Sequence, residues 1–145
     1  SAPSPTAGDT AWAMSEENVE LVRQGLEAFF VGDLERAMSI VHPDVVAVRA
    51  PPLPDPQTYH GIEGVLQMYA DWTTDFGEFE MAAGEFIDAG DRVVAEVFQR
   101  GRGQASGAVV GGRFWFVFTI ADRKTIRYDV FNDRRQALEA AGLSE

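Results

Sequence analysis

The chain has 145 residues, a length that suits one domain with a real hydrophobic core. Its apolar content of 46% and charged content of 24% are those of an ordinary globular protein. The net charge of −11 argues against binding to nucleic acids or anionic membrane surfaces, because both would repel the chain. The absence of cysteine excludes disulfides and thiolate metal sites.

The N-terminal segment carries no signal for export or membrane insertion. No apolar run approaches the ~20 residues of a membrane span, and no basic region precedes an apolar stretch. We therefore expect a cytoplasmic protein. Residues 1–13 are rich in small residues and Pro, and "MSEEN" resembles a natural start at Met14. We treat 1–13 as a cloning remnant or a flexible extension, and 14–145 as a single domain.

Three helices are predicted in the first half of the chain. Ser15 can cap the first, whose apolar residues recur at helical spacing as far as Phe30. Asp33 caps a second helix, which Pro43 stops. Gly61 opens the third helix. The sequence then changes from helical to strand periodicity.

Strands dominate the second half of the chain. Before them, between the second and third helices, a short strand is predicted at 45–50, followed by a Pro-rich loop at 51–57, which we expect to lie over the mouth of a cavity. Four more strands joined by turns are predicted at 79–88, 92–103, 108–120 and 125–132. Asp133 can cap a last short helix. This order predicts an α+β fold with an antiparallel sheet and helices on one of its faces.

The segment 111–120, "GGRFWFVFTI", is apolar on both faces of the predicted strand. One face carries Phe114, Phe116 and Phe118. The other carries Arg113, Trp115 and Val117. Both faces must therefore be covered, one by the helices of the domain and the other by something else.

Four segments resemble the SnoaL-like, ketosteroid-isomerase-like proteins of the nuclear transport factor 2 (NTF2-like) superfamily. They are "MSEENVELVRQGLEAFFVGDLERAMSIVHPDV", "TYHGIEGVLQMYADW", "EFIDAGDRVVAEV" and "DRRQALEAAGL". The resemblance covers nearly all of residues 14–143. It implies an α+β, cystatin-like cone, in which about three N-terminal helices pack on a strongly curved, mostly antiparallel sheet around an apolar pocket. It also implies, commonly, a homodimer through the outer face of the sheet.

Aligned to this family, the two faces of 111–120 receive different roles. Arg113, Trp115 and Val117 are expected to face the pocket. Phe114, Phe116 and Phe118 then face outward, where a partner subunit or the chain's own loops would cover them. We favour the homodimer.

The catalytic positions of the family hold unsuitable residues in this chain. The base, tyrosine and oxyanion-aspartate positions of ketosteroid isomerases fall on Arg49, Gly25 and Trp115, so this activity is not expected. In limonene-epoxide-hydrolase-like members, the arginine and first aspartate positions fall on Val97 and Gln99, and the second aspartate position falls on Val130. No residue at these positions can take a proton from the attacking water, so this hydrolase activity is also not expected.

Asp129 is the remaining candidate acid or base. In SnoaL-type polyketide cyclases, the histidine position corresponds to Phe116 and the acidic position to Val130, one residue from Asp129. A bulge would bring Asp129 into the pocket. The alternative, which we favour about two to one, is that Asp129 lies on the outer face and pairs with an arginine such as Arg127.

We predict that the chain binds a small, largely apolar molecule, and that an acidic or enolic aromatic would suit Arg113. The alternative is a SnoaL-like enzyme of the cyclase, isomerase or hydrolase class that uses Asp129. His42 and His60 do not belong to a metal-ligand pattern, and no motif indicates a cofactor. We therefore expect no metal ion and no organic cofactor. The predicted pocket residues are Arg49, Tyr59, Met68, Trp72, Phe76, Val97, Gln99, Arg113, Trp115, Val117, Tyr128 and Val130.

Overall fold

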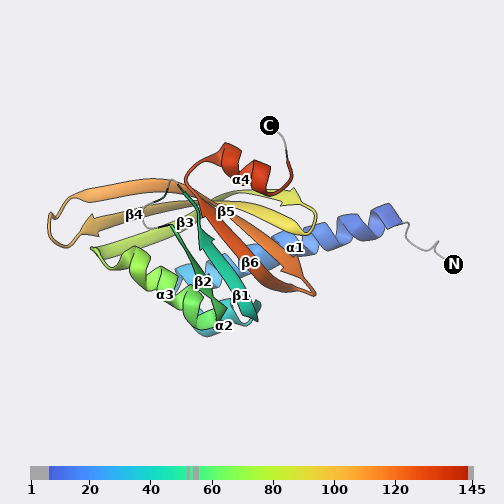
Figure 1. Cartoon of the computed structure of the whole chain (residues 1–145), viewed down its shortest axis with the longest axis horizontal. Coiled ribbons are helices and arrows are strands. Elements are labelled where there is room, and N and C mark those ends of the chain that lie inside the picture. Colours follow the sequence, from blue (N-terminus) through green and yellow to red (C-terminus); the bar gives the residue numbers. More distant parts are fainter. Residues whose placement is uncertain (1–6, 52, 54–55, 144–145) are drawn as a thin grey trace.

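The computed structural model describes residues 7–51, 53 and 56–143, with side chains described from Ser15 onward (Figure 1). Its helices are α1 (Ala7–Phe30), α2 (Leu34–Met38), α3 (Gly61–Thr73) and α4 (Arg134–Ala140). Its strands are β1 (Val41–Arg49), β2 (Gln57–His60), β3 (Phe76–Ala89), β4 (Arg92–Gly103), β5 (Val109–Ala121) and β6 (Lys124–Phe131).

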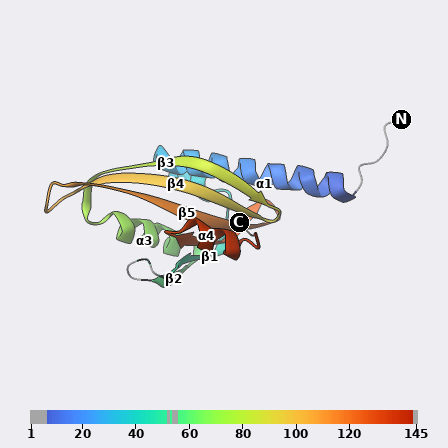
Figure 2. The same cartoon turned by 90° about the horizontal axis from the view of Figure 1, so that it is seen from above.

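The strands form one sheet of six, in the order β2-β1-β6-β5-β4-β3. Only β1 and β6 run parallel, and the other neighbouring pairs are antiparallel. The first three helices pack on one face of this curved sheet, and α4 packs on the other. Figure 2 shows α1 and α4 on opposite sides of the strands. The fold is therefore the α+β arrangement that the sequence predicts. No described helix is long and apolar enough to cross a membrane.

The first two helices have different limits from those predicted. α1 begins at Ala7, so Ser15 lies inside the helix, and its first turns extend past the sheet (Figures 1 and 2). The preceding residues "AGDTAWAM" include three alanines, the strongest helix formers, and this composition favours the continuation. The predicted extension thus lies partly within a helix, and residues 1–6 lie outside the described part.

α2 ends at Met38, and Pro43 lies within β1 instead of stopping a helix. The pairing of β1 with β6 is interrupted between Val41 and Val46. Pro43 therefore sits where the ladder does not require a backbone donor, which is the usual place for proline in a strand.

The outer face of β5 is covered by α4. Trp115 and Val117 are 2% and 1% exposed and pack with Val94 and the α4 residues Ala137 and Leu138. Because they pack there, they face away from the first three helices. The expectation that Arg113, Trp115 and Val117 face the pocket is therefore wrong.

The phenylalanines of β5 face the helical layer. Phe118 belongs to the main core, and Phe114 and Phe116 pack against it. The phenylalanines and the group of Arg113, Trp115 and Val117 lie on opposite faces of β5, as predicted. A shift of one residue in the alignment to the family exchanges the two faces, and this is why the inner and outer faces were assigned the wrong way round. These three phenylalanines are thus not on the outer face and cannot form a dimer interface there. Homodimerisation itself stays a prediction that a single chain does not test.

Candidate ligand cavity

A cavity lies between the first three helices and the inner face of the sheet. The part of this cavity in which the centre of a water molecule can lie without touching protein atoms has a volume of about 90 Å³. One water needs ~10–15 Å³ by this measure, so there is room for roughly six to nine waters, or for a one- or two-ring organic molecule. The wall consists of Val22, Gly25, Leu26, Phe29, Phe30, Ala37, Met38, Ile40, Val41, Val65, Met68, Tyr69, Trp72, Met81, Val97, Phe116, Phe118, Thr125, Tyr128 and Val130.

Three aromatic rings form the sheet side of the cavity, and we call them the aromatic platform: Phe116, Phe118 and Tyr128. The rings of Phe116 and Tyr128 are nearly parallel, at 12°, with centroids 6.4 Å apart. The ring of Phe118 lies 6.0 Å from Phe116 and 5.6 Å from Tyr128. Phe118 and Tyr128 are directly opposite across β5 and β6, which is why their side chains meet. The platform offers a flat apolar ligand a stacking surface.

The helical side of the cavity is closed by contacts between α1 and α3. The rings of Phe29 and Tyr69 meet edge to face, with centroids 4.7 Å apart. Gly25 also lines this side, and a Cβ at this position would meet the side chain of Ile40. The Ile40 side chain therefore occupies the space that a side chain at position 25 would need.

The polar groups of the wall are few and uncharged. No residue of the wall is Asp, Glu, Lys, Arg or His within the described part of the chain. Thr125 and Tyr128, both on β6, are 2% and 6% exposed. Burial raises the pKa of Tyr128, so its hydroxyl stays protonated at neutral pH.

Trp72 is a wall residue whose own polar group is already engaged. Its indole N–H donates to Oε1 of Gln99. The guanidinium carbon of Arg49 lies over the Trp72 ring, 4.9 Å from the ring centroid. The Phe114 ring packs edge to face against Trp72, with centroids 4.8 Å apart. Gln99 and Arg49 thus lie behind Trp72, outside the cavity wall. Arg49 is only 6% exposed and is therefore buried.

Tyr59 lies beside this region and bonds to Asp71, an exposed residue of α3. The Tyr59 hydroxyl donates to Oδ2 of Asp71 at 2.8 Å, and the Gln67 amide donates to Oδ1 at 2.7 Å. The hydrogen bond from Gln67, then that from Tyr59, lowers the pKa of Asp71, with a further contribution from the charge of Arg49. Tyr59 therefore contributes to this network and not to the cavity wall.

Arg113 and Asp129 both lie on the outer face of the sheet. Nη1 of Arg113 is 3.4 Å from Oε2 of Glu96, and its guanidinium lies over the outward-facing ring of Trp115. Asp129 forms an ion pair with Arg127 at 2.9 Å, as in the favoured alternative. Between Thr125 and Arg127, β6 contains one residue more than the paired part of β5, which is a β-bulge. Because of this bulge, Thr125 lies on the same inner face as Tyr128 and Val130. The cavity therefore lacks the arginine and the carboxylate that the sequence assigned to it.

The predicted pocket residues thus separate into two groups. The cavity wall includes Met68, Trp72, Val97, Tyr128 and Val130. It does not include Arg49, Tyr59, Phe76, Gln99, Arg113, Trp115 or Val117. Phe76 instead packs on Phe79, with ring centroids 5.4 Å apart.

Sequence reasoning missed the α1 side of the wall, Thr125, and the platform phenylalanines. The helical spacing of Val22, Leu26 and Phe29 could have indicated the α1 side, because such a stripe must face the sheet. Nothing in the local sequence marks Thr125, because the bulge beside it decides its direction.

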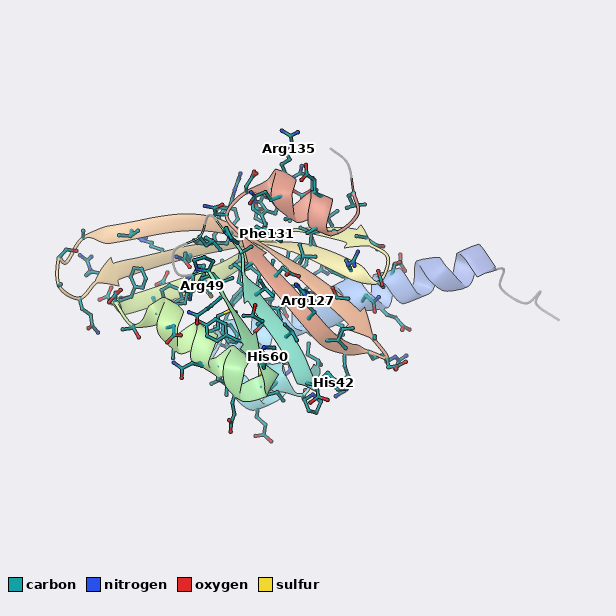
Figure 3. All side chains as sticks on the ribbon, in the orientation of Figure 1. His42, Arg49, His60, Arg127, Phe131 and Arg135 are labelled. Atoms are coloured by element: carbon teal, nitrogen blue, oxygen red, sulfur yellow. The ribbon has the colours of Figure 1, made fainter. Side chains whose placement is uncertain are left out.

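His42 lies in β1 and His60 at the end of β2 (Figure 3), and neither is a residue of the cavity wall. His60 is the exposed N-cap residue of α3, and its side chain makes no capping hydrogen bond. Nδ1 of His42 accepts from the backbone N–H of Asp44 at 2.9 Å. Among the described residues, no group of three His, Asp or Glu side chains could hold a metal ion.

The family follows from a comparison with family models, in which the SnoaL-like domain matches residues 22–128. The chain belongs to the SnoaL-like domain family. No curated protein matches this SnoaL-like chain.

Solved structures with the same NTF2-like fold are numerous. TerC, co-crystallised with polyporic acid, is 26% identical, with a TM-score of 0.70 over 87% of this chain and 98% of that one. An NTF2-like protein of unknown function from Burkholderia pseudomallei K96243 is 24% identical, with a TM-score of 0.70 over 85% and 95% of the two chains. A putative SnoaL-like polyketide cyclase from Jannaschia sp. CCS1 is 20% identical, with a TM-score of 0.71 over 97% and 96%.

Proposed function

We propose that this SnoaL-like protein binds a small, flat, largely apolar molecule in its cavity. The observation that carries the proposal is the aromatic platform of Phe116, Phe118 and Tyr128, set opposite an apolar helical wall. Apolar pockets with a few placed polar groups are the usual sites for small organic ligands. The TerC structure adds support, because a protein of this fold at 26% identity was co-crystallised with polyporic acid.

Binding is favoured over proton-transfer catalysis by the chemistry of the wall. A general base must reach the proton it removes, and in this wall the described residues include no carboxylate and no histidine. Asp129, the candidate for the enzymatic alternative, is held by Arg127 on the opposite face. Arg113 is also outside the cavity, so the proposed ligand has no arginine to meet.

Naphthalene tests the proposal, because it is flat, apolar and of the size that the cavity accommodates. We expect equilibrium dialysis to show saturable binding to the wild type. Gly25→Leu would collide with Ile40, so that one of the two side chains has to move into the cavity, and it should weaken binding at least about ten-fold.

The matched control is Ala70→Leu, which places the same leucine side chain at an exposed position of α3. It should bind naphthalene like the wild type, and thermal melting should show that both variants are folded. The proposal is overturned if the wild type does not bind, or if Gly25→Leu binds as tightly as Ala70→Leu.

A further inference from the structure

The polar end of the cavity is formed by hydroxyl groups on one strand. Thr125 and Tyr128 come from β6 and are nearly fully buried in a largely apolar wall. The other polar side chains of the wall, Tyr69 and Trp72, come from α3, and the indole N–H of Trp72 is taken by Gln99. Tyr69 is only half-buried, so the nearly fully buried hydroxyls of the wall are those on β6.

The Tyr128 hydroxyl is available for a hydrogen bond with a ligand. Within the described residues no hydrogen bond of this hydroxyl is found, and Tyr128 lines the cavity. A buried hydroxyl needs a hydrogen-bond partner to offset its lost hydration. A ligand oxygen beside it would supply that partner.

The charge of the surroundings decides which ligand oxygen fits. No cation lines the cavity in the described part of the chain, so a carboxylate would lose its water without gaining an opposite charge. The Tyr128 hydroxyl is kept neutral by burial. It can donate to a carbonyl or hydroxyl oxygen, and it can accept from a hydroxyl.

We propose that the cavity selects uncharged ligands that carry one hydroxyl or carbonyl oxygen, and that Tyr128, assisted by Thr125, is the residue that recognises this oxygen. The inference rests on the proposed function, because it describes the ligand of the same cavity. The ring of the ligand would lie on the aromatic platform, of which the Tyr128 ring is a part.

Three naphthalene derivatives test the selectivity: 2-naphthol, naphthalene and 2-naphthoate, at pH 7 by equilibrium dialysis. A buried neutral hydrogen bond is worth about a three- to ten-fold change in affinity. We expect 2-naphthol to bind tighter than naphthalene by that factor, and 2-naphthoate to bind more weakly than naphthalene. Tyr128→Phe should remove the advantage of 2-naphthol, so that the variant binds 2-naphthol and naphthalene with about equal affinity.

The matched control is Tyr59→Phe, which removes a hydroxyl that bonds Asp71 outside the cavity wall. This variant should keep the advantage of 2-naphthol. The inference is overturned if Tyr128→Phe keeps that advantage, or if 2-naphthoate binds the wild type as tightly as 2-naphthol does. In either case, binding of naphthalene to the wild type shows that the proposed function still stands. Failure of all three compounds to bind the wild type overturns both the proposed function and the inference.

Discussion

Gly84 shows how a single residue shapes the outer face of the sheet. It lies where the pairing of β3 with β4 shifts between Ala83 and Phe86. The Glu96 carboxylate occupies the space of its missing side chain and accepts the backbone N–H of Glu85 at 3.0 Å. Gly84→Ala should lower the free energy of unfolding by about 1–3 kcal/mol, because a methyl group would collide with Glu96 and Phe98. Urea denaturation measures this loss.

Gly77 provides the comparison within the same strand. A Cβ at Gly77 would have only ordinary contacts, with Gln104 Cγ nearest at 3.5 Å. Gly77→Ala should therefore change the free energy of unfolding by no more than ~0.5 kcal/mol. An equal loss in the two variants would show that the close approach of Glu96 is not what requires glycine at position 84.

At the scale of elements, α4 is the cover that the second apolar face of β5 needs. Leu138 is 4% exposed and packs into the cluster of Trp115, Val117 and Val94. Leu138→Ala should lower the free energy of unfolding by ~2–5 kcal/mol, because it leaves a cavity over these side chains. Chemical denaturation followed by tryptophan fluorescence measures the change.

Glu139→Ala is the control on the exposed side of the same helix. Glu139 pairs with Arg135 at 3.5 Å, and exposed pairs of this kind contribute ~0–1 kcal/mol. A Leu138→Ala variant as stable as Glu139→Ala would mean that α4 does not hold the outer face of β5.

The elements also show what the sequence could predict. The limits of β4 and the start of α3 at Gly61 match the observed ones, because turn residues and hydrophobic periodicity mark both. The alternation along β5 was predicted correctly, but its direction was not. That direction depends on which neighbour packs on each face, and this is a property of the whole fold.

The residues of the cavity wall were also predictable only in part. Met68 and Trp72 follow from the apolar stripe of α3, and Tyr128 and Val130 follow from alternation in β6. Thr125 escaped prediction because the bulge lies between it and Tyr128. Arg113 was misplaced because the alignment to the family reversed the faces of β5.

At the scale of the whole molecule, charge and apolar surface are separated. The net charge is −11, yet no residue that lines the cavity in the described chain is charged. Arg113 and Asp129, the charges predicted to act on the ligand, are paired with Glu96 and Arg127 on the other face. This separation is the basis for proposing a neutral, apolar ligand.

A crystal structure of the protein with 2-naphthol tests the central claim most directly. The account predicts a naphthalene ring stacked on Phe116, Phe118 and Tyr128, beneath α1 and α3. It also predicts the naphthol oxygen at hydrogen-bond distance from the Tyr128 hydroxyl, ~2.5–3.0 Å. A ligand bound outside this cavity, or one whose oxygen points away from Tyr128 inside it, would contradict the account.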